Sequence, residues 1–524
     1  MDRIAAVRVL VDTISVFQKG LEPAKAIKAA LSRALVPYYP VAGRIVETSP
    51  GEPEVACTGE GVWFVEASVD CSLKDVNNLE LPVVLPKEEL IPFAPAEVKE
   101  EDLIMMMQVT EFTCGGFAVG TRLSHPTPST RLPLSSMDRI AGIRMMIDLI
   151  LVFQQGVQPA NAMRAALSRA LVLYYPVAGR IVEPIPGEAE VDCTADGVWF
   201  VEASVDCSLE DVNNLERPLL LPRKDLIPYA PPDVIEGDLA FMLQVTEFTC
   251  GGFAVGIRFN HTVFDGLGAA QFSKAVAELA RGHACPLVKP VWCREAIPSP
   301  PKLSRRHAPS PAGIDFETSV FDISTDQINA LKNQFCRETG QKCSTFDVVT
   351  AMLWQCRTRA ISLGPHADMH LGFAANARHL LRGLLPQEGF YGNCVYPMGI
   401  KANARIIAGS SPVEVIELIR AAKTRMAAMF LDWMMGYADD PYEVPLEYGT
   451  LVVSDWCRVG FSEVDYGWGE PIHVVPLNDD HNFIPSCIYL EPSKPKQGVR
   501  LMTRCVQKEH LPAFTEEMKQ FVQN

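Results

Sequence analysis

Apolar and polar residues alternate along residues 251–261 in a way that predicts a strand ending in a histidine. The run that follows, DGLGAAQFSKAVAELARG, has apolar residues at helical spacing and stops at a glycine. The pattern therefore predicts a strand, a turn over 261–265 and a helix. His261 falls on the apolar face of the strand, which it shares with Phe253, Val255, Ile257 and Phe259.

The rest of the chain mixes helical and strand-like patterns, which predicts an α/β protein. Residues 285–315 contain PSPPKLSRRHAPSP and are too rich in proline and serine to pack as a regular element. We expect helices at 157–171, 326–338, 344–361, 412–431 and 510–523, and strands at 178–183, 190–203, 241–261, 369–377, 450–461, 472–476 and 485–505.

A long internal repeat joins the first quarter of the chain to the second at an offset of 136 residues. The opening MDRIA returns at 137, and GVWFVEASVDCSL at 61 returns at 197. About 87 of the first 125 positions are identical between the two copies. The first copy stops at His125, where a proline-rich run replaces the turn and helix that follow His261. We therefore do not expect His125 to be catalytic.

Two interpretations of this repeat stay open. One is a genuine partial tandem duplication in the expressed protein. The other is a gene model that joins two neighbouring copies in one reading frame. The second is favoured because the first copy ends inside a motif rather than at a domain boundary.

Charge, cysteines and hydropathy exclude several classes of protein. A formal net charge of −16 argues against a surface for nucleic acid or an anionic membrane. The 15 cysteines are scattered without metal-ligand spacing, which favours reduced thiols and no metal site. No apolar run has the length of a transmembrane span, and the opening residues lack the layout of a signal peptide. We therefore expect a cytoplasmic protein.

His261 and Asp265 are the first candidates for chemistry. A histidine at a buried strand end suits a general base, although a packing role is the plainer interpretation of its position alone. Asp265 immediately precedes the predicted helix, so its simplest role is to cap that helix. The spacing His-x-x-x-Asp-Gly recurs by chance in long chains and does not decide between these roles.

A second segment, DYGWG at 465–469, gives the histidine motif a context. A chain with HTVFD at 261–265 and DYGWG some 200 residues later resembles the plant BAHD acyltransferases, which carry HxxxD and DFGWG in this order. The resemblance covers roughly residues 126–524, and its one departure is Tyr466, where the family usually has phenylalanine. Further matching segments in the family's order are LSSMD at 134–138, YYPVAGR at 174–180, NAR at 376–378, FYGNC at 390–394 and SDWCR at 454–458.

The resemblance implies an α/β fold of two chloramphenicol acetyltransferase-like domains with mixed sheets and an active-site channel between them. We expect a truncated, non-catalytic duplicate at 1–125, an N-terminal acyltransferase domain at 126–285, a crossover linker at 286–315 and a C-terminal domain at 316–524. The C-terminal run most resembles the branch of taxane acetyltransferase-like and benzyl alcohol O-benzoyltransferase-like enzymes.

The resemblance also implies an activity. The expected reaction transfers an acyl group from an acyl-coenzyme A thioester to a hydroxyl, less favourably an amine, of a plant metabolite. His261 would be the general base, and the two substrates would react directly in a ternary complex. Acyl-coenzyme A is then a co-substrate, with no permanently bound cofactor, and the protein is expected to be a monomer.

Other site residues follow from the matching segments. Asp265 is expected to pair with Arg378, with the capping role still open. Asp465, Gly467, Trp468 and Gly469 are expected to shape a tight turn away from the reacting atoms. Ser454 and Trp456 are candidates for the channel and the oxyanion site, although a strand-capping role for Ser454 fits equally. Ser344 and Thr345 are candidates for coenzyme A binding, with helix capping as the simpler role.

Two rivals remain at the level of the sequence. The fusion could be a non-catalytic protein or decoy with an incomplete scaffold. The resemblance supports this, because it implies that the second copy lacks the family's first strand, which would lie upstream of residue 126, and a missing strand predicts an unpaired sheet edge. The second rival is a peptide-synthetase condensation domain, which shares the fold and an HHxxxDG motif. Asn260 in place of the first histidine, the DYGWG segment and the lack of carrier domains argue against it.

Overall fold

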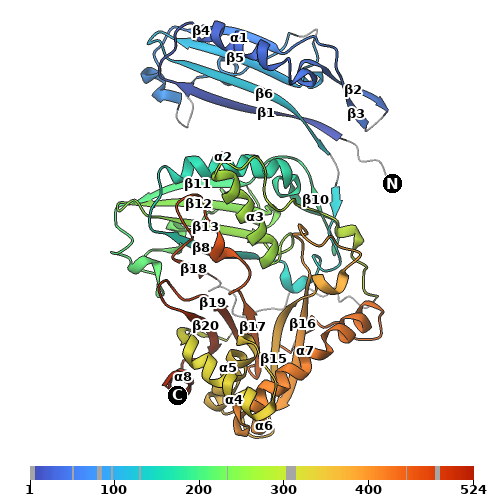
Figure 1. The fold of residues 1–524 in the computed structure, drawn as a ribbon, viewed down its shortest axis with the longest axis vertical. Helices are drawn as coiled ribbons and strands as arrows, with labels where there is room; N and C mark the ends of the chain where they lie inside the picture. Colours follow the sequence, from blue (N-terminus) through green and yellow to red (C-terminus); the bar gives the residue numbers. More distant parts are fainter. Residues whose placement is uncertain are drawn as a thin grey trace. The chain divides into compact units, whose positions relative to one another are not determined.

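A computed structural model describes residues 6–49, 52–79, 85–95, 98–128, 131–232, 234–301, 314–443, 445–477 and 484–523. The chain divides into two compact units, and each is described by itself. Unit 1 comprises residues 1–131 with the short segment 192–195, and unit 2 comprises the remaining residues. Figure 1 shows the elements of both units.

Unit 1 is a four-stranded sheet with one helix against it. The strands lie in the order β1-β6-β5-β4, and α1 packs on β5. Strand β6 continues through His125 to Pro128 while it pairs with β1, so no turn or helix follows this histidine, as expected. The side chain of His125 lies outside the described residues. The elements are β1 (Ala6–Phe17), α1 (Pro23–Ala34), the hairpin β2 (Arg44–Ser49) and β3 (Glu52–Ala56), β4 (Trp63–Val69), β5 (Met105–Phe112) and β6 (Phe117–Pro128).

The first half of unit 2 repeats this arrangement and extends it. Its five-stranded sheet has the order β11-β12-β13-β8-β18, and α2 and α3 pack together against it (Figure 1). A smaller sheet has the order β7-β10-β9. The elements are β7 (Arg131–Pro133), β8 (Met146–Phe153), α2 (Pro159–Leu173), β9 (Arg180–Ile185), β10 (Glu188–Asp192), β11 (Trp199–Val205), β12 (Phe241–Phe248), β13 (Phe253–Asn260) and α3 (Gly266–Ala280).

Strand β18 (His473–Pro476) comes from the far end of the chain and closes the β8 edge of this sheet. Its ladder is antiparallel, and the N–H of Ile472 donates to the carbonyl of Val152 at 2.7 Å. His473 adds a contact between its Nε2 and the carbonyl oxygen of Asn214 at 2.6 Å. The β8 edge of the second copy is therefore paired.

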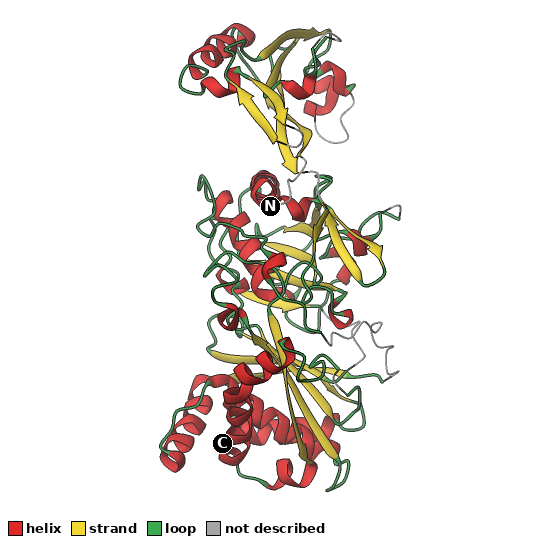
Figure 2. Cartoon of the chain, turned by 90° about the vertical axis from the view of Figure 1, so that its right-hand side faces the viewer, coloured by secondary structure: helices red, strands yellow, loops and turns green. Residues whose placement is uncertain are grey.

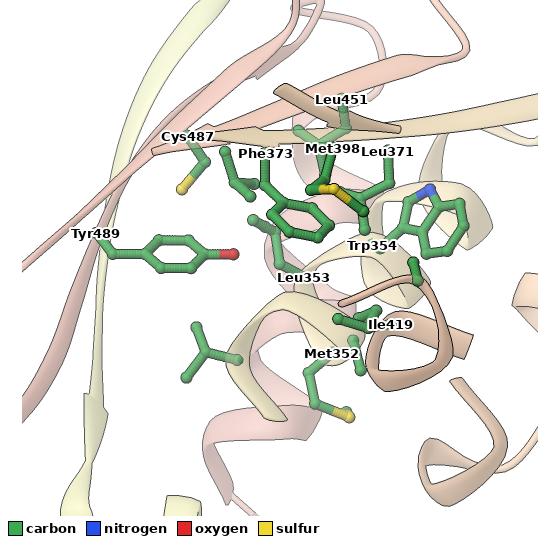
Figure 3. Packing of buried hydrophobic residues seen from close by; sticks show 14 of the residues in the cluster. Met352, Leu353, Trp354, Leu371, Phe373, Met398, Ile419, Leu451, Cys487 and Tyr489 are labelled. Carbon is green, nitrogen blue, oxygen red and sulfur yellow. The ribbon is translucent and has the colours of Figure 1, made fainter. Parts of the chain in front are cut away.

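The second half of unit 2 is a six-stranded mixed sheet with helices on one face (Figure 2). Its strand order is β14-β20-β19-β17-β15-β16. Helix α5 forms the centre of the core, and its Trp354 lies beside Leu371 and Met398 (Figure 3). The elements are β14 (Glu317–Ser324), α4 (Thr325–Thr339), α5 (Thr345–Ile361), β15 (Asp368–Asn376), β16 (Val395–Asn403), α6 (Ala404–Gly409), α7 (Pro412–Met434), β17 (Thr450–Asp455), β19 (Ser486–Leu490), β20 (Gly498–Val506) and α8 (Leu511–Gln523).

The predicted α/β class with mixed sheets is confirmed, because the five-stranded and the six-stranded sheet of unit 2 each combine parallel and antiparallel pairs. The sequence pattern missed β8, which lies between β13 and β18 and is buried over nearly its whole length. Its sequence, MIDLILVF, is apolar apart from Asp148 and therefore shows no alternation. The pattern also missed β14 and β16, and the strand expected at 450–461 ends at Asp455.

The segment expected to be a crossover linker is packed at its beginning. Arg294, in a short 3-10 turn at Arg294–Ala296, is 1% exposed, and Ile297 also belongs to the core. Residues 302–313, which carry most of the proline-rich run, lie outside the described residues. Among the described helices, none is both long and apolar enough to cross a membrane.

Candidate active site

The turn 261–265 connects β13 to α3, as the alternation and the helical spacing predict. Neighbouring segments hold it through its backbone. The N–H of His261 donates to the carbonyl of Met145 at 2.9 Å, and the His261 carbonyl accepts from Asn393 Nδ2 at 2.7 Å. The Val263 carbonyl accepts from the guanidinium of Arg294. The histidine is therefore carried on a turn with little freedom to move.

Asp265 is buried and accepts four hydrogen bonds. Its Oδ1 receives the N–H of Gly268 at 2.9 Å, which is the capping bond of α3. The guanidinium of Arg378 reaches both carboxylate oxygens, at 2.7 and 2.9 Å. The N–H of Cys394 supplies the fourth bond at 3.1 Å. The expected Asp265–Arg378 ion pair is thus present and bidentate, and the capping role that was left open is present as well.

The surroundings of the turn lower the pKa of both of its titratable groups, Asp265 and His261. Burial raises the pKa of Asp265, but Arg378 and the backbone donors outweigh it and hold the pKa below its ordinary value. Burial lowers the pKa of His261 below its ordinary value, although its own carbonyl, Asp265 and Asn393 act in the opposite direction. Near neutral pH the turn therefore carries a carboxylate and a neutral imidazole.

A second buried ion pair supports the same turn, and sequence reasoning did not assign it. Asp138 and Arg294 have fully buried side chains, with Nε and Oδ2 3.0 Å apart. The other Asp138 oxygen accepts from the backbone N–H and the side-chain Nδ2 of Asn393, both at 2.9 Å. Asn393 thereby connects Asp138 to the carbonyl of His261. Asp138 and Asn393 lie in the LSSMD and FYGNC segments, which carried the family resemblance but no stated role.

A cavity of about 580 Å³ opens beside His261. Residues from both halves of unit 2 line it, including residues of β15, β17, β19 and β20. Its walls are mostly apolar, with examples in Ile147, Phe259, Phe373 and Met502. Such a cavity excludes water from a reaction and offers contacts to an apolar ligand.

Ser454 and Trp456 line this cavity, as the resemblance implies. The indole Nε1 of Trp456 donates to the Ser454 hydroxyl oxygen at 3.1 Å. Since the serine oxygen accepts this bond, its own proton is available to donate elsewhere. Cys487 also lines the cavity, and burial raises the pKa of its thiol well above the ordinary value. That thiol is protonated at neutral pH and a poor nucleophile.

The 465–469 segment forms a tight turn, and none of its five residues lines the cavity. Oδ1 of Asp465 accepts the N–H groups of Gly467 and Gly469 at 2.8 and 2.9 Å. Both glycines have positive φ, 110° and 96°, which side chains with a Cβ tolerate poorly. Trp468 packs edge-on against Phe253, with ring centroids 5.6 Å apart. The turn therefore fixes the C-terminal part of the chain to the sheet that carries His261.

Tyr466 fills the position where the family usually has phenylalanine. Its ring packs edge-on against Phe153 at 5.6 Å, and the side chain is 2% exposed. Among the residues that the structure describes, none forms a hydrogen bond with the hydroxyl, and burial raises its pKa. An unpaired buried hydroxyl destabilises the folded state.

Ser344 and Thr345 lie at the start of α5, and neither lines the cavity. The Ser344 hydroxyl caps the helix by accepting the N–H of Asp347 at 3.1 Å. Lys332 Nζ donates to the Thr345 hydroxyl at 2.8 Å, and Lys423 Nζ lies 2.7 Å from the Asp347 carboxylate. The helix N-terminus thus has two ammonium groups beside it.

Comparisons with known proteins agree with this architecture. A model of the family described as the Transferase family matches residues 2–127 and 124–521. Acyl transferase 4 of rice (Oryza sativa subsp. japonica) is 45% identical over 418 residues, which cover 76% of this chain and 95% of the relative. The myricetin 3-O-glucosyl 1,2-rhamnoside 6'-O-caffeoyltransferase AT2 of Crocosmia x crocosmiiflora is 43% identical over 424 residues, or 76% of this chain and 96% of that protein.

The chain belongs to the BAHD acyltransferase family. It is therefore an acyltransferase at the level of the family. The fold is also that of a solved structure, F. sporotrichioides TRI101 complexed with coenzyme A and T-2. The two agree with a TM-score of 0.57 at 15% identity, over 75% of this chain and 98% of the other.

The Asp265–Arg378 pair should dominate the stability of the turn. Replacing either residue by alanine leaves a buried charge unpaired, so we expect a loss of roughly 3–5 kcal/mol in the free energy of unfolding. The double variant should lose much less than the sum of the two single losses. Urea titration of the three variants measures this coupling.

An exposed pair of the same chain supplies the control. Lys401 and Asp368 lie 2.8 Å apart with side chains 60% and 45% exposed. Asp368→Ala should cost no more than about 1 kcal/mol. Additive losses at Asp265 and Arg378, or losses no larger than that of the control, would contradict the role given to the buried pair.

Tyr466→Phe should stabilise the protein or leave its stability unchanged, because it removes a buried hydroxyl without a partner and keeps the ring. The free energy of unfolding should rise by at most about 3 kcal/mol. Thermal unfolding of the wild type and the variant measures the difference. A clear fall in melting temperature would show that the hydroxyl has a partner in the folded protein.

Proposed function

We propose that this protein transfers an acyl group from an acyl-coenzyme A thioester to a hydroxyl group of a plant metabolite, with His261 as the general base. One observation carries the proposal. The imidazole of His261 lines a mostly apolar cavity of about 580 Å³, on a turn held by two buried ion pairs. Catalysis by proton abstraction needs a neutral imidazole in a fixed place; the lowered pKa of His261 and the contacts of its turn support the proposal on both points.

The reaction begins when neutral His261 takes the proton of the acceptor hydroxyl as its oxygen attacks the thioester carbonyl. A tetrahedral oxyanion forms and then collapses, which breaks the carbon–sulfur bond and releases the coenzyme A thiolate. The imidazolium returns its proton to that thiolate, so that an ester and a free thiol leave the enzyme. The protonated thiol of Cys487 supports this direct transfer over an acyl-enzyme.

Ser454 is our candidate donor for the oxyanion. Its hydroxyl oxygen is occupied by the indole N–H of Trp456, so the hydroxyl proton is free to point into the cavity. A donor prearranged in an apolar cavity stabilises developing charge more than water does. Trp456 then orients the serine rather than contacting the oxyanion.

Coenzyme A supplies the acyl group as a co-substrate, and we propose that its phosphates bind near the start of α5. Ser344 and Thr345 mark this helix N-terminus, where the helix dipole favours anions. Lys332 and Lys423 provide positive charge within reach of it. TRI101, which shares the fold, was crystallised with coenzyme A.

A hydroxyl acceptor is favoured over an amine because the Crocosmia relative, 43% identical, is an O-caffeoyltransferase. The free cysteines fit the cytoplasmic location expected from the sequence, which stays part of the proposal.

The division of the chain also belongs to the proposal. Residues 1–125 would be a truncated, non-catalytic duplicate, and 126–285 the N-terminal acyltransferase domain. Residues 286–315 would be the crossover, and 316–524 the C-terminal domain. The two overlapping matches of the family model and the repeat at an offset of 136 support it.

His261→Ala should reduce free-thiol release from acetyl- or benzoyl-coenzyme A, assayed with a panel of alcohols, to the background rate. The matched control is His125→Ala, the same change in the first copy, which should leave the rate unchanged. Equal rates in wild type and His261→Ala would refute the catalytic assignment. A large loss in His125→Ala would show that the first copy takes part.

The pH profile of kcat/KM reports the same base. Since burial lowers the pKa of His261, the base form should persist below the ordinary histidine value of about 6.5. Activity should therefore fall as the pH is lowered, with its midpoint below that value, and be level near pH 7. A midpoint above 7 would contradict an imidazole that is neutral at pH 7.

A further inference from the structure

Because of the internal repeat, the sheet of unit 1 and the five-stranded sheet of unit 2 have matching strands. The unit 2 sheet is completed by a C-terminal strand, so the two sheets can be compared at that edge. Unit 1 stacks Phe17 of β1 on Phe117 of β6 with centroids 4.7 Å apart and planes 9° apart. In the matching pair of unit 2, Phe153 and Phe253, the ring centroids lie 4.7 Å apart and the ring planes differ by 5°. The two sheets therefore share one geometry at their β1 and β8 edges.

In unit 2 the β8 edge is covered by the C-terminal part of the chain. Strand β18 pairs with Leu149–Val152, and Tyr466 packs on Phe153. As a result Val152 is 0% and Phe153 1% exposed.

In unit 1 the matching residues are exposed. Val16 is 40% and Phe17 44% exposed, and among the described residues β6 is the one strand that pairs with β1. The apolar cluster beneath this edge shares most of its positions with its counterpart in unit 2, which also includes Val152, Leu219 and the C-terminal residues Ile472, Val475 and Leu477. Unit 1 thus presents the acceptor edge of the family's sheet without the strand that fills it.

The strand that would fit this edge is already in use. Each chain has one β18, and its backbone is hydrogen-bonded to β8 at both ends, to the carbonyls of Val152 and Asp148. If β18 moved from β8 to β1, the edge of β8 would lose its hydrogen bonds, so the number of unpaired edges would stay the same.

A second β1 has the required properties. Every chain supplies one such edge, so the unpaired backbone groups of two β1 strands can hydrogen-bond to each other. A two-fold axis makes two copies of a strand antiparallel, which is the polarity that β18 has on β8. The outward backbone groups of β1 are those of Asp12, Ile14 and Val16, because their counterparts on β8 bond to β18.

We propose that two copies of this chain associate through antiparallel pairing of their β1 strands, which joins two four-stranded sheets into one. Unpaired edges of this length template pairing with another chain, and no charge lies between residues 13 and 17 to prevent it. The sequence alone favours a monomer; the open edge favours a dimer. The inference concerns unit 1 and does not depend on the acyl-transfer reaction.

Sedimentation velocity of the full-length chain at micromolar concentration tests this proposal. The expected species has twice the 57.7 kDa mass of one chain. The double variant Val16→Lys/Phe17→Lys places two charges at the edge and should sediment as a monomer with unchanged acyl transfer. Leu21→Lys changes an apolar residue that is 92% exposed and outside the strand, and it should remain a dimer.

Hydrogen exchange of the unaltered chain gives a second readout that needs no variant. The amides of Ile14 and Val16 should be protected at high concentration and lose protection on dilution, while the amides of Thr13 and Ser15, which face β6, stay protected. A wild-type monomer, protection of Ile14 and Val16 that does not change on dilution, or a dimer that survives the lysine variant would overturn the proposal.

Discussion

The arrangement of the site depends on the buried contact between Asp265 and Arg378. Arg378 follows β15 in the C-terminal half, whereas Asp265 follows β13 in the N-terminal half, so one ion pair fixes the distance between two sheets. The geometry leaves no carboxylate oxygen of Asp265 free for proton transfer. The aspartate thus positions the turn, and in the proposed mechanism His261, at the other end of the turn, takes the proton.

A second buried ion pair, Asp138–Arg294, also holds the turn that carries His261. Asp138 and Arg294 come from segments far apart in the chain and meet beneath the turn. Through Asn393 they hold the carbonyl of His261, and through Arg294 that of Val263. A buried ion pair contributes little net stability, but it strongly disfavours arrangements that leave either charge unpaired. The two pairs therefore favour one position for the turn that carries the imidazole.

Much of the fold around the site could be predicted from the local sequence pattern. The elements and contacts that could not be predicted depend on burial or on segments far apart in the chain. Alternation and helical spacing located β13, α3 and the helices of the C-terminal half, because polar and apolar residues follow the period of the element there. In β13 the polar residues Arg258 and Asn260 share one face, although the whole strand is buried. The buried strand β8 has no such pattern. Its partner β18 and the contacts of Asp138 and Arg294 depend on segments that meet only in the folded chain. The Asp265–Arg378 pair was expected through family resemblance, not from spacing.

The central claim is that His261 receives the proton of the acceptor hydroxyl. A crystal structure of the protein with coenzyme A and a non-reacting acceptor alcohol tests it most directly. The account predicts the acceptor oxygen within about 2.6–3.2 Å of the His261 ring nitrogen that faces the cavity, with Asp265 still bound to Arg378. An acceptor bound in the cavity but nearer to Ser454 or Cys487, with His261 out of reach, would contradict it.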